Sequence, residues 1–144
     1  MTYYLADVNV LVAAVHQAHV HHRAARDWCH ALDRDQLWLC RFTQMGLLRL
    51  LTNRHVMSGA VMTQIEAWRT LDDLCTNARL RYLDEPPGVG DLFRRFTQGQ
   101  FPRRKAWSDA YLGAVAAGGG LTVATFDSDF LRLDAPALVL SSRA

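Results

Sequence analysis

Short apolar runs alternate along the chain with longer segments in which apolar residues recur at helical spacing. Apolar runs typical of buried strands occupy residues 3–6, 37–40, 80–83, 121–126 and 137–140. Helical spacing of apolar residues covers about residues 25–32, 43–51, 61–75, 89–96 and 108–117. Strands separated by helical crossovers pair in parallel, and a parallel sheet is covered on both faces, so the pattern predicts an α/β fold. We expect three layers, α/β/α, around a mostly parallel central sheet of about five strands.

Polar residues and glycines mark where these elements are expected to begin and end. Asp7 and Asn9 predict a turn that ends the first strand. Thr43 and Ser108 carry the hydroxyl side chains preferred at helix N-caps. The glycines at 118–120 predict a helix end, because glycine adopts the left-handed conformation found there at little cost.

The composition is that of an ordinary globular protein. The chain has 144 residues, of which 50% are hydrophobic and 21% charged, and we expect one domain spanning residues 1–144. We expect neither a membrane span nor a signal peptide, since no apolar run reaches about 18 residues and the first residues carry no basic cluster. The three cysteines form no CxxC pair, so a cytoplasmic protein without disulfides or structural zinc is the natural interpretation.

Four acidic residues stand where an α/β sheet places its ligands. Asp7 follows the first strand, Asp127 and Asp129 follow the most apolar late strand, and Asp109 lies in the first turn of the helix before that strand. In an open parallel sheet these positions share one edge, beyond the carboxyl ends of the strands. All four carboxylates are therefore expected to reach one crevice.

Each acid also has a structural interpretation. Asp109 complements a helix dipole, Asp127 and Asp129 are turn-formers, and Asp7 can cap a turn. A purely structural role is harder to assign to all four acids together, because clustered carboxylates repel one another unless a cation is present. Mg²⁺, or Mn²⁺ in its place, takes oxygen ligands from carboxylates, waters and substrate phosphate. Such a site suits hydrolysis of a phosphodiester by a water bound to the metal.

Three ordered motifs carry a resemblance to a known family. The segments Leu5–Leu11, Ser108–Leu112 and Thr125–Phe130 resemble the PIN-domain ribonucleases, and more specifically the VapC toxins of bacterial type II toxin–antitoxin pairs. The similarity also includes His22–Trp28 and Phe42–Leu50, and so extends along nearly the whole chain. No single motif is decisive, but their order in a chain of this length is specific.

The resemblance implies a fold, an activity and partners. It implies a PIN-like domain acting as a toxic, Mg²⁺-dependent endoribonuclease, with Asp7, Asp109 and Asp127 as catalytic metal ligands and Asp129 as a ligand or neighbour. It also implies inhibition by a VapB-type antitoxin and assembly into a homodimer. The family usually carries a further glutamate in the second of the helices expected above, where this chain has Gly46. One tightly held Mg²⁺ is therefore expected rather than a full two-metal site.

Basic residues crowd the segment before Asp109. The net charge is only +2, yet five cations fall within twelve residues: Arg94, Arg95, Arg103, Arg104 and Lys105. Beside a metal cleft they would bind RNA phosphates without regard to sequence; otherwise they form a solvated loop. Trp107 is expected to pack near the helix start, with stacking on a base as the alternative.

Other functions remain open on the sequence alone. A catalytically weak or inactive PIN-fold module could bind RNA or a protein partner without cleaving, since the expected glutamate is missing. An aspartate-nucleophile phosphatase requires a second acid at position 9, where the chain has Asn9. A phosphoacceptor domain requires a lysine after a late strand, whereas Lys105 precedes Asp109. The endoribonuclease is the favoured interpretation.

Overall fold

A five-stranded, all-parallel sheet forms the centre of the computed structural model, which describes residues 1–99 and 103–142. Its spatial order is β3-β2-β1-β4-β5, so the first strand lies in the middle. The strands are β1 (Tyr4–Ala6), β2 (Leu37–Leu39), β3 (Arg81–Tyr82), β4 (Thr122–Thr125) and β5 (Ala137–Val139). The predicted α/β fold and its parallel sheet are confirmed.

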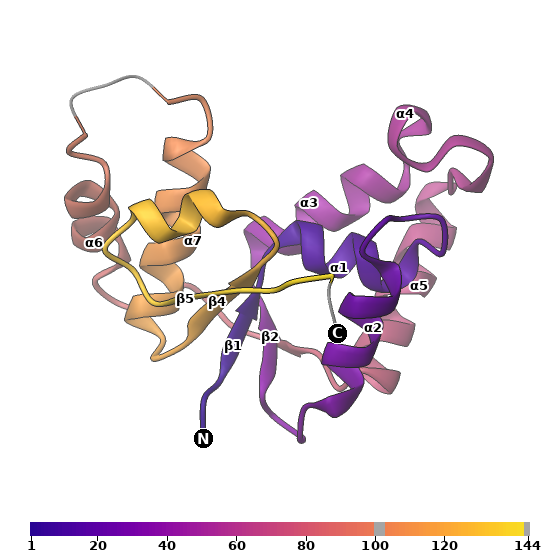
Figure 1. Ribbon diagram of the computed structural model, residues 1–144, viewed down its shortest axis with the longest axis horizontal. Helices are drawn as coiled ribbons and strands as arrows, with labels where there is room; N and C mark the ends of the chain where they lie inside the picture. Colours follow the sequence, from indigo (N-terminus) through magenta and orange to yellow (C-terminus); the bar gives the residue numbers. More distant parts are fainter. Residues whose placement is uncertain (100–102, 143–144) are drawn as a thin grey trace.

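Helices cover both faces of the sheet (Figure 1). On one face lie α1 (Val8–Val15), α2 (His22–Ala31), α3 (Arg41–Leu51) and α5 (Gln64–Asn77), and on the other lie α6 (Val89–Phe96) and α7 (Ala106–Gly118). Shorter elements are α4 (Arg54–Met57) and the 3₁₀ turns η1 (Ser58–Ala60) and η2 (Ser128–Arg132). No helix in the described part of the chain has the length and apolar character needed to cross a bilayer.

Alternating strand residues supply two separate hydrophobic cores. Leu37 and Leu39 of β2 pack into the core beneath α1, α2, α3 and α5, whereas Trp38 between them packs against the core beneath α6 and α7. In β1, Ala6 belongs to the first core and Leu5 to the second. This two-residue alternation, with both faces buried, is what defines the three-layer arrangement.

The first helix begins where the sequence predicted a turn. Asp7 ends β1 and caps α1 directly, since its Oδ1 accepts a hydrogen bond from the Val8 N–H at 2.7 Å. The residues of α1 are almost all apolar, and those from Val10 to Ala13 are buried. A helix that is apolar on every side shows no amphipathic period, which explains why the hydrophobic pattern did not reveal it.

Two predicted N-caps were displaced by a few residues. The helix expected to start after Thr43 begins at Arg41, and the helix expected after Ser108 begins at Ala106. The Thr43 hydroxyl bonds back to Cys40, and that of Ser108 bonds back to the Lys105 carbonyl at 3.2 Å. Both hydroxyls thus bond to the N-cap residue from within the first turn, so they indicate a helix start without marking its first residue.

Close packing between α1 and α3 depends on Gly46. A methyl group on Gly46 would lie 2.6 Å from Cγ2 of Val8, far inside van der Waals contact. Gly46 therefore lets the two helices approach each other. The same contact explains why the glutamate expected from the family resemblance cannot occupy this position unless Val8 moves.

We expect Gly46→Ala to destabilise the protein by about 1 kcal/mol, because the steric overlap outweighs the higher helix propensity of alanine. In a Val8→Ala background, which removes the opposing methyl groups, the same substitution should become neutral or stabilising. Urea unfolding of the four proteins in this double-mutant cycle measures the coupling. An equal effect of Gly46→Ala in both backgrounds would show that Val8 is not the constraint.

Candidate active site

Asp7 is fixed in place by the central strand and its neighbour. Its Oδ1 caps α1, and its Oδ2 accepts a hydrogen bond from the Thr125 hydroxyl at 2.8 Å. The backbone N–H of Asp7 also donates to the Ala124 carbonyl at 2.9 Å. Both oxygens of the carboxylate are thus oriented at the edge where β1 and β4 end.

The Thr125 hydroxyl connects the two loops that follow these strands. Besides donating to Asp7, it accepts from the Asp127 N–H at 3.0 Å and from Nδ2 of Asn9 at 3.3 Å. Asn9 completes the link, because its Oδ1 accepts from the Phe126 N–H at 3.2 Å. Thr125 is fully buried, so this network holds Asp7 and Asp127 in a fixed relation.

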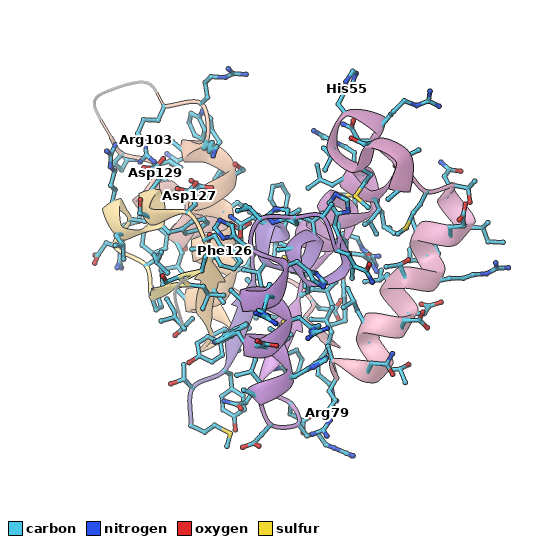
Figure 2. All side chains as sticks on the ribbon, turned by 45° about the vertical axis from the view of Figure 1, so that its right-hand side comes forward. His55, Arg79, Arg103, Phe126, Asp127 and Asp129 are labelled. Atoms are coloured by element: carbon cyan, nitrogen blue, oxygen red, sulfur yellow. The ribbon has the colours of Figure 1, made fainter. Side chains whose placement is uncertain are left out.

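Asp127 and Asp129 lie in the turn after β4. Oδ1 of Asp127 accepts from the Asp129 N–H at 2.9 Å and caps η2, while its Oδ2 lies 3.3 Å from Nζ of Lys105. Oδ1 of Asp129 lies 3.9 Å from Nε of Arg132. Figure 2 shows Asp127 and Asp129 beside Arg103 at one end of the molecule, and Arg79 at the opposite end.

Asp109 approaches the same place from the first turn of α7. Its side chain is only 9% exposed, and its Oδ2 has no hydrogen-bond partner among the described residues. Burial, and after it the negative charges of Asp7 and Asp127, raise the pKa of Asp109 to about 6. The electrostatic interaction of all three acids shows that segments distant in sequence converge here.

The other two acids respond differently to their surroundings. Burial raises the pKa of Asp7, against the lowering effect of its hydrogen bonds to Thr125 and Val8, and the charge of Asp127 raises it further. The pKa of Asp127 is lowered, mainly by the bond from the Asp129 N–H and also by Lys105. The cluster therefore contains one carboxylate stabilised as an anion and two that are costly to ionise.

The donor set fits a hard divalent cation. A buried carboxylate oxygen without a partner and mutual repulsion among the acids are both relieved by a bound cation. As they stand, no three His, Cys, Asp or Glu side chains of the described residues form a ready-made ligand set. This is compatible with Mg²⁺, which proteins commonly hold through one or two carboxylates with waters completing the shell.

The predicted basic residues differ in what they contact. Lys105 contacts Asp127, and Arg103 lies close enough to Asp109 and Asp127 to affect their pKa values. Arg95 pairs with Asp134 at 3.8 Å, whereas Arg94 and Arg104 are exposed. Of the five predicted basic residues, Arg103 and Lys105 are thus the two that shift the pKa values of the acids.

A cavity of about 570 Å³ lies beside the acids, between the end of α6, the start of α7 and η2. Its lining includes three arginines, Arg95, Arg103 and Arg132, together with Phe96 and Trp107. Trp107 is 63% exposed and lies 6.1 Å from Phe93 between ring centroids, so it packs on one neighbour and keeps most of its surface free.

Sequence reasoning missed the roles of three residues. Thr125 and Asn9 position the acids, and Lys105 contacts them. Asn9 follows Asp7 by two residues, and Thr125 precedes Asp127 by two. The sequence therefore does show a polar residue close to each of these acids. That Lys105 turns toward Asp127 depends on how α7 is placed against β4, for which no local signal exists.

Sequence comparisons relate the chain to known proteins along most of its length. The sequence model of the PIN domain matches residues 4–136. The chain is 38% identical over 131 residues to Ribonuclease VapC41 of Mycobacterium tuberculosis, covering 88% of this chain and 90% of that protein. It is 32% identical to Ribonuclease VapC29 of the same organism, with 94% of each chain covered.

Solved structures share the fold at low sequence identity. VapBC2 from Rickettsia felis bound to a promoter DNA fragment superposes with a TM-score of 0.68 at 13% identity, covering 97% of this chain and 100% of that one. Mycobacterium tuberculosis VapC20, described as a sarcin-ricin loop cleaving toxin, gives 0.63 at 15% identity, covering 90% and 93%. At these identities the likeness concerns the fold alone.

The raised pKa of Asp109 predicts a pH-dependent stability. The carboxyl group ionises near 3.8 in the unfolded chain but only near 6 in the folded protein. Its contribution to the free energy of unfolding is therefore present at low pH and is lost as the pH rises from about 4 to about 6. Asp109→Asn, which cannot ionise, should gain stability relative to the wild type over that range. Denaturant unfolding of both proteins in EDTA measures the difference, and a difference that does not vary with pH would contradict the assignment.

Proposed function

The chain belongs to the PIN domain family and is related along most of its length to VapC ribonucleases. From this premise we propose that it is a metal-dependent endoribonuclease, the toxin of a type II toxin–antitoxin pair. The observation that carries the proposal is the convergence of Asp7, Asp109 and Asp127 from three distant segments, with a buried Asp109 oxygen that lacks a partner. Such a set is electrostatically unfavourable without a cation.

Asp7, Asp109 and Asp127 would hold the cation, directly or through its waters, with Asp129 beside them. When bound, Mg²⁺ or Mn²⁺ would supply positive charge that activates a water and stabilises charge developing on the phosphodiester. The protein contributes the orientation of the carboxylates through Thr125 and Asn9. The near-complete burial of Asp109 limits the number of waters that can compete for that carboxylate.

Arginine side chains would hold the RNA. Arg103 lies next to the acids, and Arg94, Arg95 and Arg104 extend the positive charge along α6 and the segment before α7. Contacts of this kind reach the backbone phosphates and carry no sequence information. Their strength falls with salt, so RNA binding should weaken steeply as ionic strength rises.

The proposed partners are a VapB-type antitoxin and a second copy of the chain. Structures of similar fold include VapBC complexes, some of them bound to DNA. An antitoxin with a basic segment would complement the acidic pocket, in the same way that a cation does. We place the activity in the cytoplasm, where cellular RNA is available to it.

A second candidate is a PIN-fold module that binds RNA or a partner without cleaving. It is favoured by one observation, the tight contact between Gly46 and Val8, which leaves no space for the family's glutamate. The module would keep the arginine contacts and lose turnover. A cleavage assay separates the two candidates.

We expect Asp7→Asn and Asp109→Asn to reduce RNA cleavage by at least about 100-fold, because each removes a carboxylate from the cation site. Wild-type activity should disappear in EDTA and return with Mg²⁺ or Mn²⁺. The measurement is the cleavage rate of total cellular RNA, and Asp72→Asn on the exposed surface of α5 is the matched control. Cleavage by Asp109→Asn at the wild-type rate would refute the catalytic assignment.

Lys105 should compete with the cation for Asp127. Its ammonium lies 3.3 Å from Oδ2 of Asp127, so a divalent ion at the same carboxylate meets an existing positive charge. We expect Lys105→Gln to bind Mn²⁺ about fivefold more tightly, a modest gain because Lys105 is largely exposed. Titration calorimetry measures the affinity. Arg104→Gln removes the same charge one residue away and should leave the Mn²⁺ affinity within about twofold; equal affinities for Lys105→Gln and the wild type would contradict the competition.

A further inference from the structure

The cavity between α6, α7 and η2 has the chemistry of a nucleotide subsite. Resting on the proposed ribonuclease function, we infer that it binds one nucleotide of single-stranded RNA adjoining the scissile phosphodiester, with the base against Trp107 and a phosphate on Arg103 and Arg132. Its volume of about 570 Å³ falls in the range of small-molecule binding sites. The site lies outside the acid cluster and uses different side chains.

Trp107 provides the stacking surface. It occupies the first turn of α7 and remains 63% exposed, although it is one of the largest apolar side chains in the protein. Its ring meets that of Phe93 at an angle of 58°, so Phe93 supports it without stacking in parallel. An indole that is supported and largely exposed is suited to receive a base, since every base presents a flat π-surface.

The arginines of the cavity differ in their availability to a phosphate. Arg95 is already engaged, by Asp134 at 3.8 Å and by the Phe96 ring at 5.5 Å. Arg103 has no ion-pair partner within 4.0 Å among the described residues, and Arg132 has only the 3.9 Å contact with Asp129. Among the described residues, Arg103 is therefore the arginine of the lining without an ion pair. Arg132, like Arg95, has one long and exposed ion pair, but its guanidinium lies over no aromatic ring in the described part of the chain and can turn toward the same phosphate, whose oxygens accept from the guanidinium fork.

These two arginines also connect the lining of the cavity electrostatically to the acids. Arg132 contacts Asp129, and Arg103 interacts electrostatically with Asp109 and Asp127. A chain of RNA with one phosphodiester at the acids would thus place its next nucleotide in the cavity. An acidic peptide could also meet the arginines, but its carboxylates present no planar base to stack on the exposed Trp107 indole.

Binding of fluorescein-labelled RNA tests the subsite. The probe is a uridine oligonucleotide of about twelve residues, measured by anisotropy in EDTA, where cleavage is absent. We expect Trp107→Ala to weaken binding about tenfold, in the range found for loss of one stacked base, and Trp107→Phe to retain most of the affinity. Trp68→Ala, which removes another exposed tryptophan on α5, is the matched control and should bind as the wild type does. Thermal unfolding verifies that each variant is folded.

An abasic scan identifies the base contact itself. One abasic position within the oligonucleotide should weaken binding to the wild type and have no further effect on Trp107→Ala. The inference is overturned if Trp107→Ala binds RNA within about twofold of the wild type, or if the abasic penalty persists in that variant. It is also overturned if a glutamate dodecapeptide binds the wild type as tightly as RNA and loses affinity in Trp107→Ala, which would assign the cavity to a protein partner.

The test separates this subsite from the proposed function. If wild-type protein with Mn²⁺ cleaves RNA and Trp107→Ala binds and cleaves equally well, the subsite fails and the ribonuclease stands. If RNA binding depends on Trp107 but no cleavage occurs with Mn²⁺, the base contact stands and the ribonuclease fails. A wild type that neither binds RNA in EDTA nor cleaves it with Mn²⁺ removes both.

Discussion

One hydroxyl group joins the two halves of the candidate site. Thr125 donates to Asp7 and accepts from the backbone of Asp127, so it links two acidic loops that their like charges push apart. The link exists because β1 and β4 are parallel neighbours in register, with Ala6 beside Ala124. Asp109, approaching from α7, completes a cluster of acids whose mutual repulsion a bound cation would relieve, and the proposed ribonuclease activity depends on that arrangement.

Much of the fold could be predicted from local patterns in the sequence. The run from Leu121 to Phe126 is apolar and rich in β-branched residues, and it forms β4 with one residue removed from its start and one from its end. The helix predicted at Val89–Phe96 has those bounds in the structure. Asp7, Asp109 and Asp127 could be placed at one edge because the ends of parallel strands and the starts of the returning helices share it.

Other features depend on packing that no local pattern records. The helix α1 is apolar throughout and lacks a period, and Thr43 and Ser108 act within the first turns of their helices rather than before them. The sequence shows that Gly46 stands where an acid is expected. The reason, the close approach of Val8, is visible only in the three-dimensional structure. The contact of Lys105 with Asp127 likewise arises from the docking of α7 against the sheet.

The central position of the first strand has a consequence for the order of events during synthesis. Residues 1–99 contain only one of the four clustered acids, and β1 remains without its neighbour β4 until residues 122–125 exist. During synthesis the chain can therefore form the β3-β2-β1 half of the sheet early, while the acid cluster is still incomplete. In the proposed ribonuclease, the catalytic centre would therefore be assembled only after most of the polypeptide has been synthesised, which would leave time for the proposed antitoxin to be made.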